Sequence, residues 1–137
     1  MMNQPKTILI VEDEQNLLDV LADKLGASGF SVLKAENGEK GLDLALKYHP
    51  DLILLDILMP KMDGLTMVRR LREDVWGSTA SVIILTNLVD NEKVMEAVKN
   101  KVSDYLIKTD CKLKDLVEMI KKKLGLNRTF QSSVYYY

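Results

Sequence analysis

Residues 52–56 have the sequence LILLD, which is four apolar residues followed at once by an aspartate. Three other short apolar runs resemble it, and none of the four alternates between apolar and polar positions. The four runs are Ile8–Val11, Leu52–Leu55, Val82–Leu85 and Tyr105–Ile107. Continuous apolar runs of this length are typical of strands covered on both faces, as in a parallel sheet. Residues 31–35 (SVLKA) predict a weaker strand nearer the edge of that sheet.

Segments with helical spacing separate the predicted strands. Leucines at positions 17, 18, 21 and 25 recur at three- and four-residue steps, so they place one apolar stripe on the sheet. Asn37, Asp63 and Asp90 are suited to cap the three helices that follow them. The last helix carries its apolar residues between Leu113 and Leu124, and Gly125 is suited to end it.

Five strands that alternate with five helices predict an α/β fold with helices on both faces of one parallel sheet. Five strands are too few for an eight-stranded barrel, so the pattern favours an open, doubly wound sheet. In such a sheet the functional site lies beyond the carboxyl ends of the strands, where the strand order reverses.

Length and composition predict a single cytoplasmic domain. The chain has 137 residues, of which 47% are hydrophobic and 28% charged, and its formal net charge is −1. This balance gives no overall attraction to nucleic acid, and the apolar runs are far shorter than the roughly 20 residues that cross a bilayer. Cys111 is the only cysteine, so no intrachain disulfide is possible and a reducing compartment is expected.

Chemically distinctive residues stand where the predicted strands end. They are Glu12, Asp13 and Glu14 after the first strand, Asp56 after the third, Thr86 and Asn87 at the end of the fourth, and Lys108 after the fifth. An acidic residue at a helix start is often explained by the helix dipole, which accounts well for Glu14 and partly for Glu12. The dipole does not explain Asp56, which directly follows four apolar residues.

A divalent cation is the expected partner of these acidic residues. If the first and third strands are neighbours, Glu12, Asp13 and Asp56 converge, and carboxylates held together repel one another. Lys108 offsets one of their three negative charges and leaves −2, which a divalent cation would balance. Oxygen ligands without a His/Cys cluster favour Mg²⁺ over zinc.

These motifs resemble the receiver domains of two-component response regulators. The resemblance rests on residues 8–14 (ILIVEDE), 52–60 (LILLDILMP), 62–64 (MDG), 84–86 (ILT) and 104–108 (DYLIK), with the spacings of that family. It covers about Lys6 to Leu124 and implies a flavodoxin-like (βα)5 fold with strand order 2-1-3-4-5. The implied domains are a receiver at 1–125 and a C-terminal tail or truncated linker at 126–137.

The resemblance also implies a phosphoacceptor site. Asp56 would accept a phosphoryl group from the phosphohistidine of a sensor histidine kinase or a phosphotransfer protein. Asp13 and Asp56 would bind Mg²⁺ directly, Glu12 would act through water, and the Leu58 main-chain carbonyl would complete the protein ligands. Such a domain is not an enzyme beyond phosphorylating itself from a donor and dephosphorylating itself.

The remaining strand-end residues would bind the phosphoryl group and transmit its presence. Lys108, the Thr86 hydroxyl and the Asn87 backbone N–H would contact the phosphoryl oxygens. Thr86 and Tyr105 match the two switch positions of the family. The output face would comprise the fourth helix, the fifth strand and the fifth helix; it would contact a partner that the sequence does not identify, and it could support a phosphorylation-linked homodimer.

Three other function classes use similar folds or residues. A phosphohydrolase resembling the haloacid dehalogenase family would need a second aspartate two positions after the first, where this chain has Leu58. A flavin carrier would need a phosphate-cradling loop after the first strand, where the acidic run would repel the phosphate. A degenerate receiver, which binds proteins independently of phosphorylation, is the stronger alternative, although Asp13, Asp56, Thr86 and Lys108 are all present.

Overall fold

The computed structural model describes residues 4–56, 59, 62–86, 104–107 and 113–126. Its centre is a sheet of five parallel strands in the order β2-β1-β3-β4-β5. The strands are β1 (Thr7–Val11), β2 (Ser31–Ala35), β3 (Leu52–Leu55), β4 (Val82–Thr86) and β5 (Asp104–Ile107). The predicted doubly wound sheet and its strand order are confirmed, with β2 at one edge.

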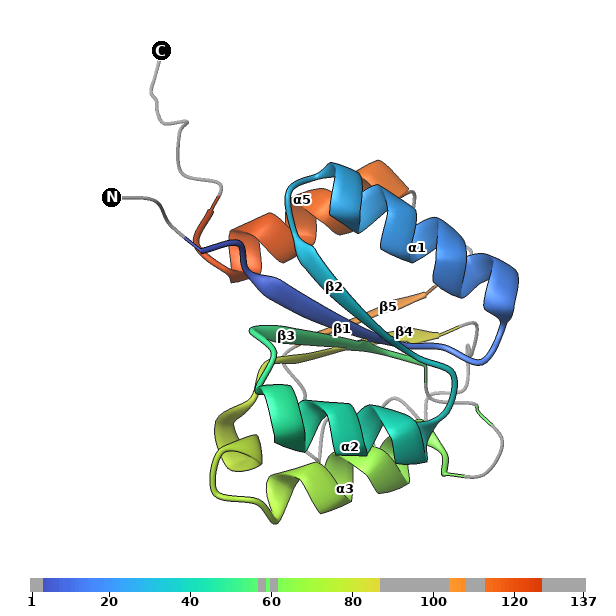
Figure 1. Ribbon diagram of the computed structural model, residues 1–137, viewed down its shortest axis with the longest axis vertical. Helices are drawn as coiled ribbons and strands as arrows, with labels where there is room; N and C mark the ends of the chain where they lie inside the picture. The colour runs from blue at the N-terminus through green and yellow to red at the C-terminus, as the bar shows by residue number, and fades with distance from the viewer. Residues whose placement is uncertain (1–3, 57–58, 60–61, 87–103, 108–112, 127–137) are drawn as a thin grey trace.

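Helices cover both faces of the sheet. The described helices are α1 (Gln15–Ala27), α2 (Gly38–Tyr48), α3 (Gly64–Arg72), the short 3₁₀ helix η1 (Gly77–Thr79) and α5 (Leu113–Lys123). Helices α1 and α5 lie on one face, and α2 and α3 lie on the other (Figure 1). The helix predicted after Asp90 lies outside the described residues. No helix in the described ranges is long and apolar enough to span a membrane.

The alternation of side chains along the buried strands divides the core into two layers. Ile8 and Ile10 of β1 pack with the apolar faces of α1 and α5, whereas Leu9 and Val11 pack with α2 and α3. Strands β1 and β3 are buried on both faces, as their continuous apolar sequences predict. Three leucines of the predicted stripe on α1 are buried at the sheet: Leu18, Leu21 and Leu25.

The helix ends follow the local sequence signals. The side chain of Asn37 accepts a hydrogen bond from the Lys40 backbone N–H at 2.8 Å, and that of Asp63 accepts one from the Thr66 N–H at 2.8 Å. Both predicted N-caps are therefore confirmed. After α5 the chain turns at Gly125, whose φ of 71° lies in the left-handed region that favours glycine.

The connection between α3 and β4 is tied together by Arg72. Its guanidinium donates hydrogen bonds to the main-chain carbonyls of Gly77 at 2.7 Å and Ala80 at 2.8 Å. Burial lowers the pKa of the Arg72 guanidinium from its usual value, but arginine stays protonated at neutral pH. In the same connection, the Trp76 ring stacks on His49 with centroids 4.3 Å apart and an interplanar angle of 7°.

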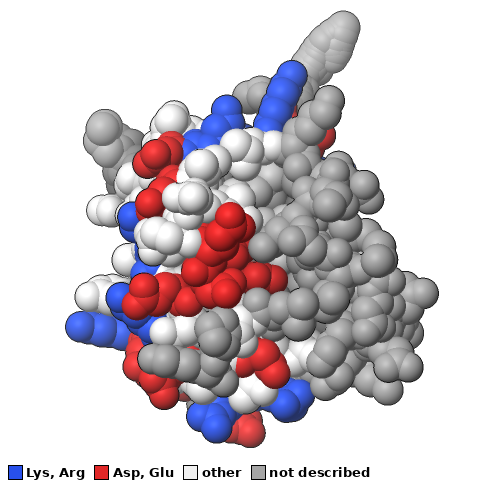
Figure 2. All heavy atoms as spheres, turned by 90° about the vertical axis from the view of Figure 1, so that its right-hand side faces the viewer, with Lys and Arg blue, Asp and Glu red and all other residues white. Residues whose placement is uncertain are grey.

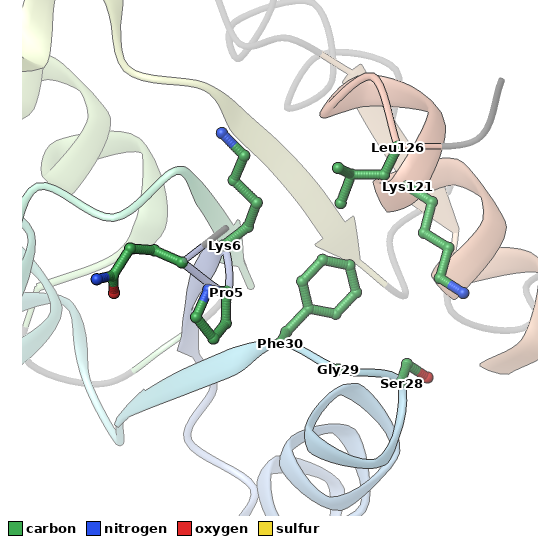
Figure 3. Close-up of a pocket in the computed structure, with 8 residues that line it drawn as sticks. Pro5, Lys6, Ser28, Gly29, Phe30, Lys121 and Leu126 are labelled. Atoms are coloured by element: carbon green, nitrogen blue, oxygen red, sulfur yellow. The ribbon is translucent and has the colours of Figure 1, made fainter. Parts of the chain in front are cut away.

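An open hollow of about 630 Å³ lies at the amino ends of the strands, away from Asp56. Lys6 and Phe30, which line it, immediately precede β1 and β2. Figure 3 shows Phe30 between the Pro5–Lys6 segment and Leu126. This hollow is therefore separate from the edge of the sheet where the acidic residues gather.

Arg72→Ala is expected to destabilise the protein by roughly 1–3 kcal/mol, because two carbonyls lose a charged donor. Urea unfolding followed by the fluorescence of Trp76, the only tryptophan in the chain, measures this loss. Arg70→Ala is the matched control: Arg70 is exposed on the same helix, and the expected change is within about 0.5 kcal/mol. Equal stability of Arg72→Ala and the parent would show that the hydrogen bonds of Arg72 do not stabilise the fold.

Candidate functional site

Three carboxylates meet beyond the carboxyl ends of β1 and β3. Glu12, Asp13 and Asp56 each offer a carboxylate oxygen, and these oxygens all lie within 4.8 Å of one another. Glu12 and Asp56 are buried, with 2% and 6% of their surfaces exposed, whereas Asp13 is exposed. The predicted convergence of the three residues is confirmed.

The pairing of β1 with β3 brings these residues together. Val11 and Leu55 are register partners and are the last residues of their strands, so Glu12 and Asp56 leave the sheet side by side. The Asp56 N–H donates a hydrogen bond to the Val11 carbonyl at 3.0 Å and extends this pairing by one residue. Asp56 is thus held by backbone hydrogen bonding that does not depend on its own side chain.

The start of α1 also contributes to the site. The Glu14 backbone N–H donates a hydrogen bond to Oε2 of Glu12 at 3.1 Å. Glu14 occupies the N-cap position of α1, and its side chain makes no capping hydrogen bond. The helix dipole predicted a role for the Glu14 side chain, but this contact with the site is made by its backbone. Sequence reasoning missed it because every residue except proline has such a donor.

The described residues at the carboxyl ends of the strands form an acidic patch. Figure 2 shows the Asp and Glu atoms gathered near the centre of the face at these strand ends. Carboxylates this close repel one another unless a positive charge compensates them. The three site residues offer oxygen ligands only, which are the ligands that a hard cation such as Mg²⁺ prefers. The acidic triad therefore fits a Mg²⁺ site.

The structure positions two more predicted residues through their strands. Thr86 is the last residue of β4 and pairs with Ile107 at the same edge of the sheet as the triad. Tyr105 lies in β5, where it pairs with Ile84. The other predicted site residues lie outside the described part of the chain: Leu58, Asn87 and Lys108. Their roles stay predictions.

A comparison with protein families identifies the family to which this arrangement belongs. The family model of the response regulator receiver domain matches residues 8–121. The chain belongs to this family. The matched range contains the acidic triad and all five strands of the receiver domain apart from Thr7 at the start of β1.

Curated relatives of this receiver domain are longer proteins. It is 35% identical over 121 residues to the "DNA-binding dual master transcriptional regulator RpaA" of Synechocystis sp., in a match that covers 88% of this chain and 48% of that protein. It is 37% identical over 101 residues to the "Regulatory protein AtoC" of Escherichia coli, with 74% and 22% covered. The chain thus spans about half or less of the length of these relatives.

Solved structures share the fold of this receiver domain. A CheY-like response regulator receiver domain protein from Methanospirillum hungatei superposes with a TM-score of 0.83 at 27% identity, and the match covers 89% of this chain and 95% of that one. A putative response regulator from Chloroflexus aurantiacus gives a TM-score of 0.81 at 30% identity, with 89% and 99% covered.

Addition of Mg²⁺ to the metal-free parent is expected to raise the midpoint of thermal unfolding. A ligand that binds only the folded state stabilises it by about 2.7 kcal/mol at one hundred times Kd. Asp13→Asn should lose most of this response because it removes a ligand charge, and its metal-free midpoint should rise because repulsion falls.

The matched control for this experiment is Asp23→Asn, because Asp23 is exposed on α1 and is not part of the triad. Its response to Mg²⁺ should equal that of the parent. An undiminished Mg²⁺ response in Asp13→Asn would show that this carboxylate is not a ligand.

Proposed function

We propose that this receiver domain accepts a phosphoryl group on Asp56 from the phosphohistidine of a sensor histidine kinase or a phosphotransfer protein. The observation that carries the proposal is a buried Asp56 within 4.8 Å of Glu12 and Asp13, in a chain of the receiver family. The partner supplies the phosphoryl group, and this domain supplies the residue that receives it. It turns over no separate substrate.

The transfer is a displacement at phosphorus. A carboxylate oxygen of Asp56 forms a bond to phosphorus while the bond between phosphorus and the partner's histidine nitrogen breaks, and its electron pair returns to the imidazole. The product is an acyl phosphate on Asp56. The incoming group is negatively charged and must approach two further carboxylates, Glu12 and Asp13. Without compensation, their repulsion would oppose the transfer.

The triad compensates this repulsion by holding a cation. When bound there, Mg²⁺ would supply positive charge to the phosphoryl oxygens. Asp13 and Asp56 would hold the ion directly, Glu12 would act through water, and the Leu58 carbonyl would add a main-chain ligand. The hydrogen bond from the Glu14 N–H to Glu12 supports this division, because it restrains the orientation of the Glu12 carboxylate.

The response to phosphorylation involves the neighbouring strands. Lys108, the Thr86 hydroxyl and the Asn87 N–H would contact the phosphoryl oxygens, and Thr86 and Tyr105 would form the switch. The positions of Thr86 at the end of β4 and of Tyr105 in the adjacent β5 support this pairing. A full switch of population, from 1:99 to 99:1, needs about 5.5 kcal/mol of differential stabilisation.

This domain itself signals through protein contacts and does not bind nucleic acid or membrane directly. A net charge of −1 gives the domain no general attraction to phosphate backbones or anionic lipids. The output face comprises β5, α5 and the helix predicted after Asp90. It binds an unidentified partner and supports a phosphorylation-linked homodimer.

The proposal that Asp56 is the phosphoacceptor can be tested by mass spectrometry. The intact protein is weighed after incubation with Mg²⁺ and a small phosphodonor. The parent should gain the mass of one phosphoryl group and Asp56→Asn should gain none, because an amide is not a competent nucleophile here. Asp23→Asn should be modified like the parent. Addition to Asp56→Asn would refute the assignment of the acceptor.

Absence of addition to the parent is tested further with histidine kinases as donors. If no donor modifies the parent, the chain is the degenerate receiver that binds its partners independently of phosphorylation. In that case Asp56→Asn should bind those partners as the parent does.

A further inference from the structure

The first residue of α2, Gly38, packs against the main chain of the β3–α3 connection. Gly38 is buried, and a Cβ atom added to it would collide with the main-chain oxygen of Met62. The same Cβ would lie 3.0 Å from the carbonyl carbon of Met62 and 3.1 Å from its Cβ. A main-chain carbonyl cannot rotate aside as the end of a side chain can. Any other residue at position 38 therefore forces one of the two backbones to move.

Met62 belongs to the segment that leaves the phosphoacceptor strand. It follows Asp56 by six residues and directly precedes Asp63, whose side chain caps α3. Met59, which lies between Asp56 and Met62 in the sequence, is buried in the core formed with α2 and α3. Met62 packs against the same core. Two described residues of this connection therefore have defined contacts: Met59 with the core, and Met62 with the core and with Gly38.

Helix α2 also contacts the end of β1, which is followed by the other two carboxylates of the triad. One turn further on, a Cβ atom added to Gly41 would lie 2.7 Å from Cγ2 of Val11, the residue before Glu12. The first two turns of α2 therefore touch the end of β1 and the segment that follows β3. These are the two segments that carry the three carboxylates.

We propose that Gly38 is a positioning residue for the metal site. Because it has no side chain, α2 can lie against Met62 and Val11 together, which adds a second restraint to the β1–β3 pairing that brings Asp56 to Glu12 and Asp13. A displacement of Met62 moves the far end of this short segment and changes the geometry of the oxygen ligands. The inference rests on the proposed metal-assisted phosphoacceptor function.

The test compares two glycines whose substitution creates the same kind of collision. In Gly38→Ala the new Cβ meets the Met62 carbonyl, and in Gly77→Ala it meets the Leu71 carbonyl at the opposite end of the sheet. Both variants should be less stable than the parent. Only Gly38→Ala should bind Mg²⁺ more weakly, by roughly 10-fold, as occurs when the support of a metal ligand is disturbed.

Mg²⁺ affinity is measured by calorimetric titration at a temperature where Trp76 fluorescence shows all variants folded. An unchanged affinity in Gly38→Ala, or an equal loss in Gly77→Ala, would overturn the inference while leaving the proposed function intact. A parent that neither binds Mg²⁺ nor accepts a phosphoryl group would overturn both. Phosphorylation of Asp56 by a small phosphodonor should slow in Gly38→Ala alone.

A second variant decides the question if Gly38→Ala does not fold. Met62→Gly adds no atom but frees the main chain that Gly38 holds, so its Mg²⁺ affinity should also fall. Val75→Gly is its control, because Val75 is 92% exposed and follows α3 at the other end of the helix. Equal Mg²⁺ affinities for Met62→Gly, Val75→Gly and the parent would reject the positioning role.

Discussion

The parallel pairing of β1 with β3 is the constraint on which the site depends. Its register sets Val11 beside Leu55, so the next residues, Glu12 and Asp56, emerge together at one edge of the sheet. Apolar contacts on both faces maintain this register, because a slip by one residue would exchange the two core layers of a strand. The core therefore determines which carboxylates meet, although no core residue takes part in the chemistry.

The same strand pairing lowers the stability of the folded protein when no cation is bound, because it holds carboxylates together. Two of its carboxylates are almost completely buried, and all three lie within 4.8 Å of one another. The fold holds them there with backbone interactions: the Asp56 N–H bonds to the Val11 carbonyl, and the Glu14 N–H bonds to Glu12. The bond from the Asp56 N–H joins main-chain atoms only, so it does not depend on the charge state of the Asp56 side chain. The arrangement can therefore persist before and after a phosphoryl group is added.

The sequence predicted those parts of the molecule that depend on a pattern within a few neighbouring residues. Asn37 and Asp63 cap helices through hydrogen bonds to residues three positions away, and the apolar runs identify buried strands by their composition. The triad could be predicted because strand ends converge in a doubly wound sheet. The packing of Gly38 on Met62 could not, because it joins two backbones far apart in sequence and involves no distinctive side chain.

The two ends of the sheet have different physical roles. At the amino ends of the strands, Arg72 ties the α3–β4 connection to two carbonyls and Trp76 stacks on His49; these contacts stabilise the fold and involve no residue of the acidic triad. At the carboxyl ends the chain concentrates charge, which lowers stability. The cores and the amino ends of the strands therefore supply the stability that offsets the repulsion around Asp56. Close packing of α2 on the segment after Asp56 then links the rigid core to the reactive edge.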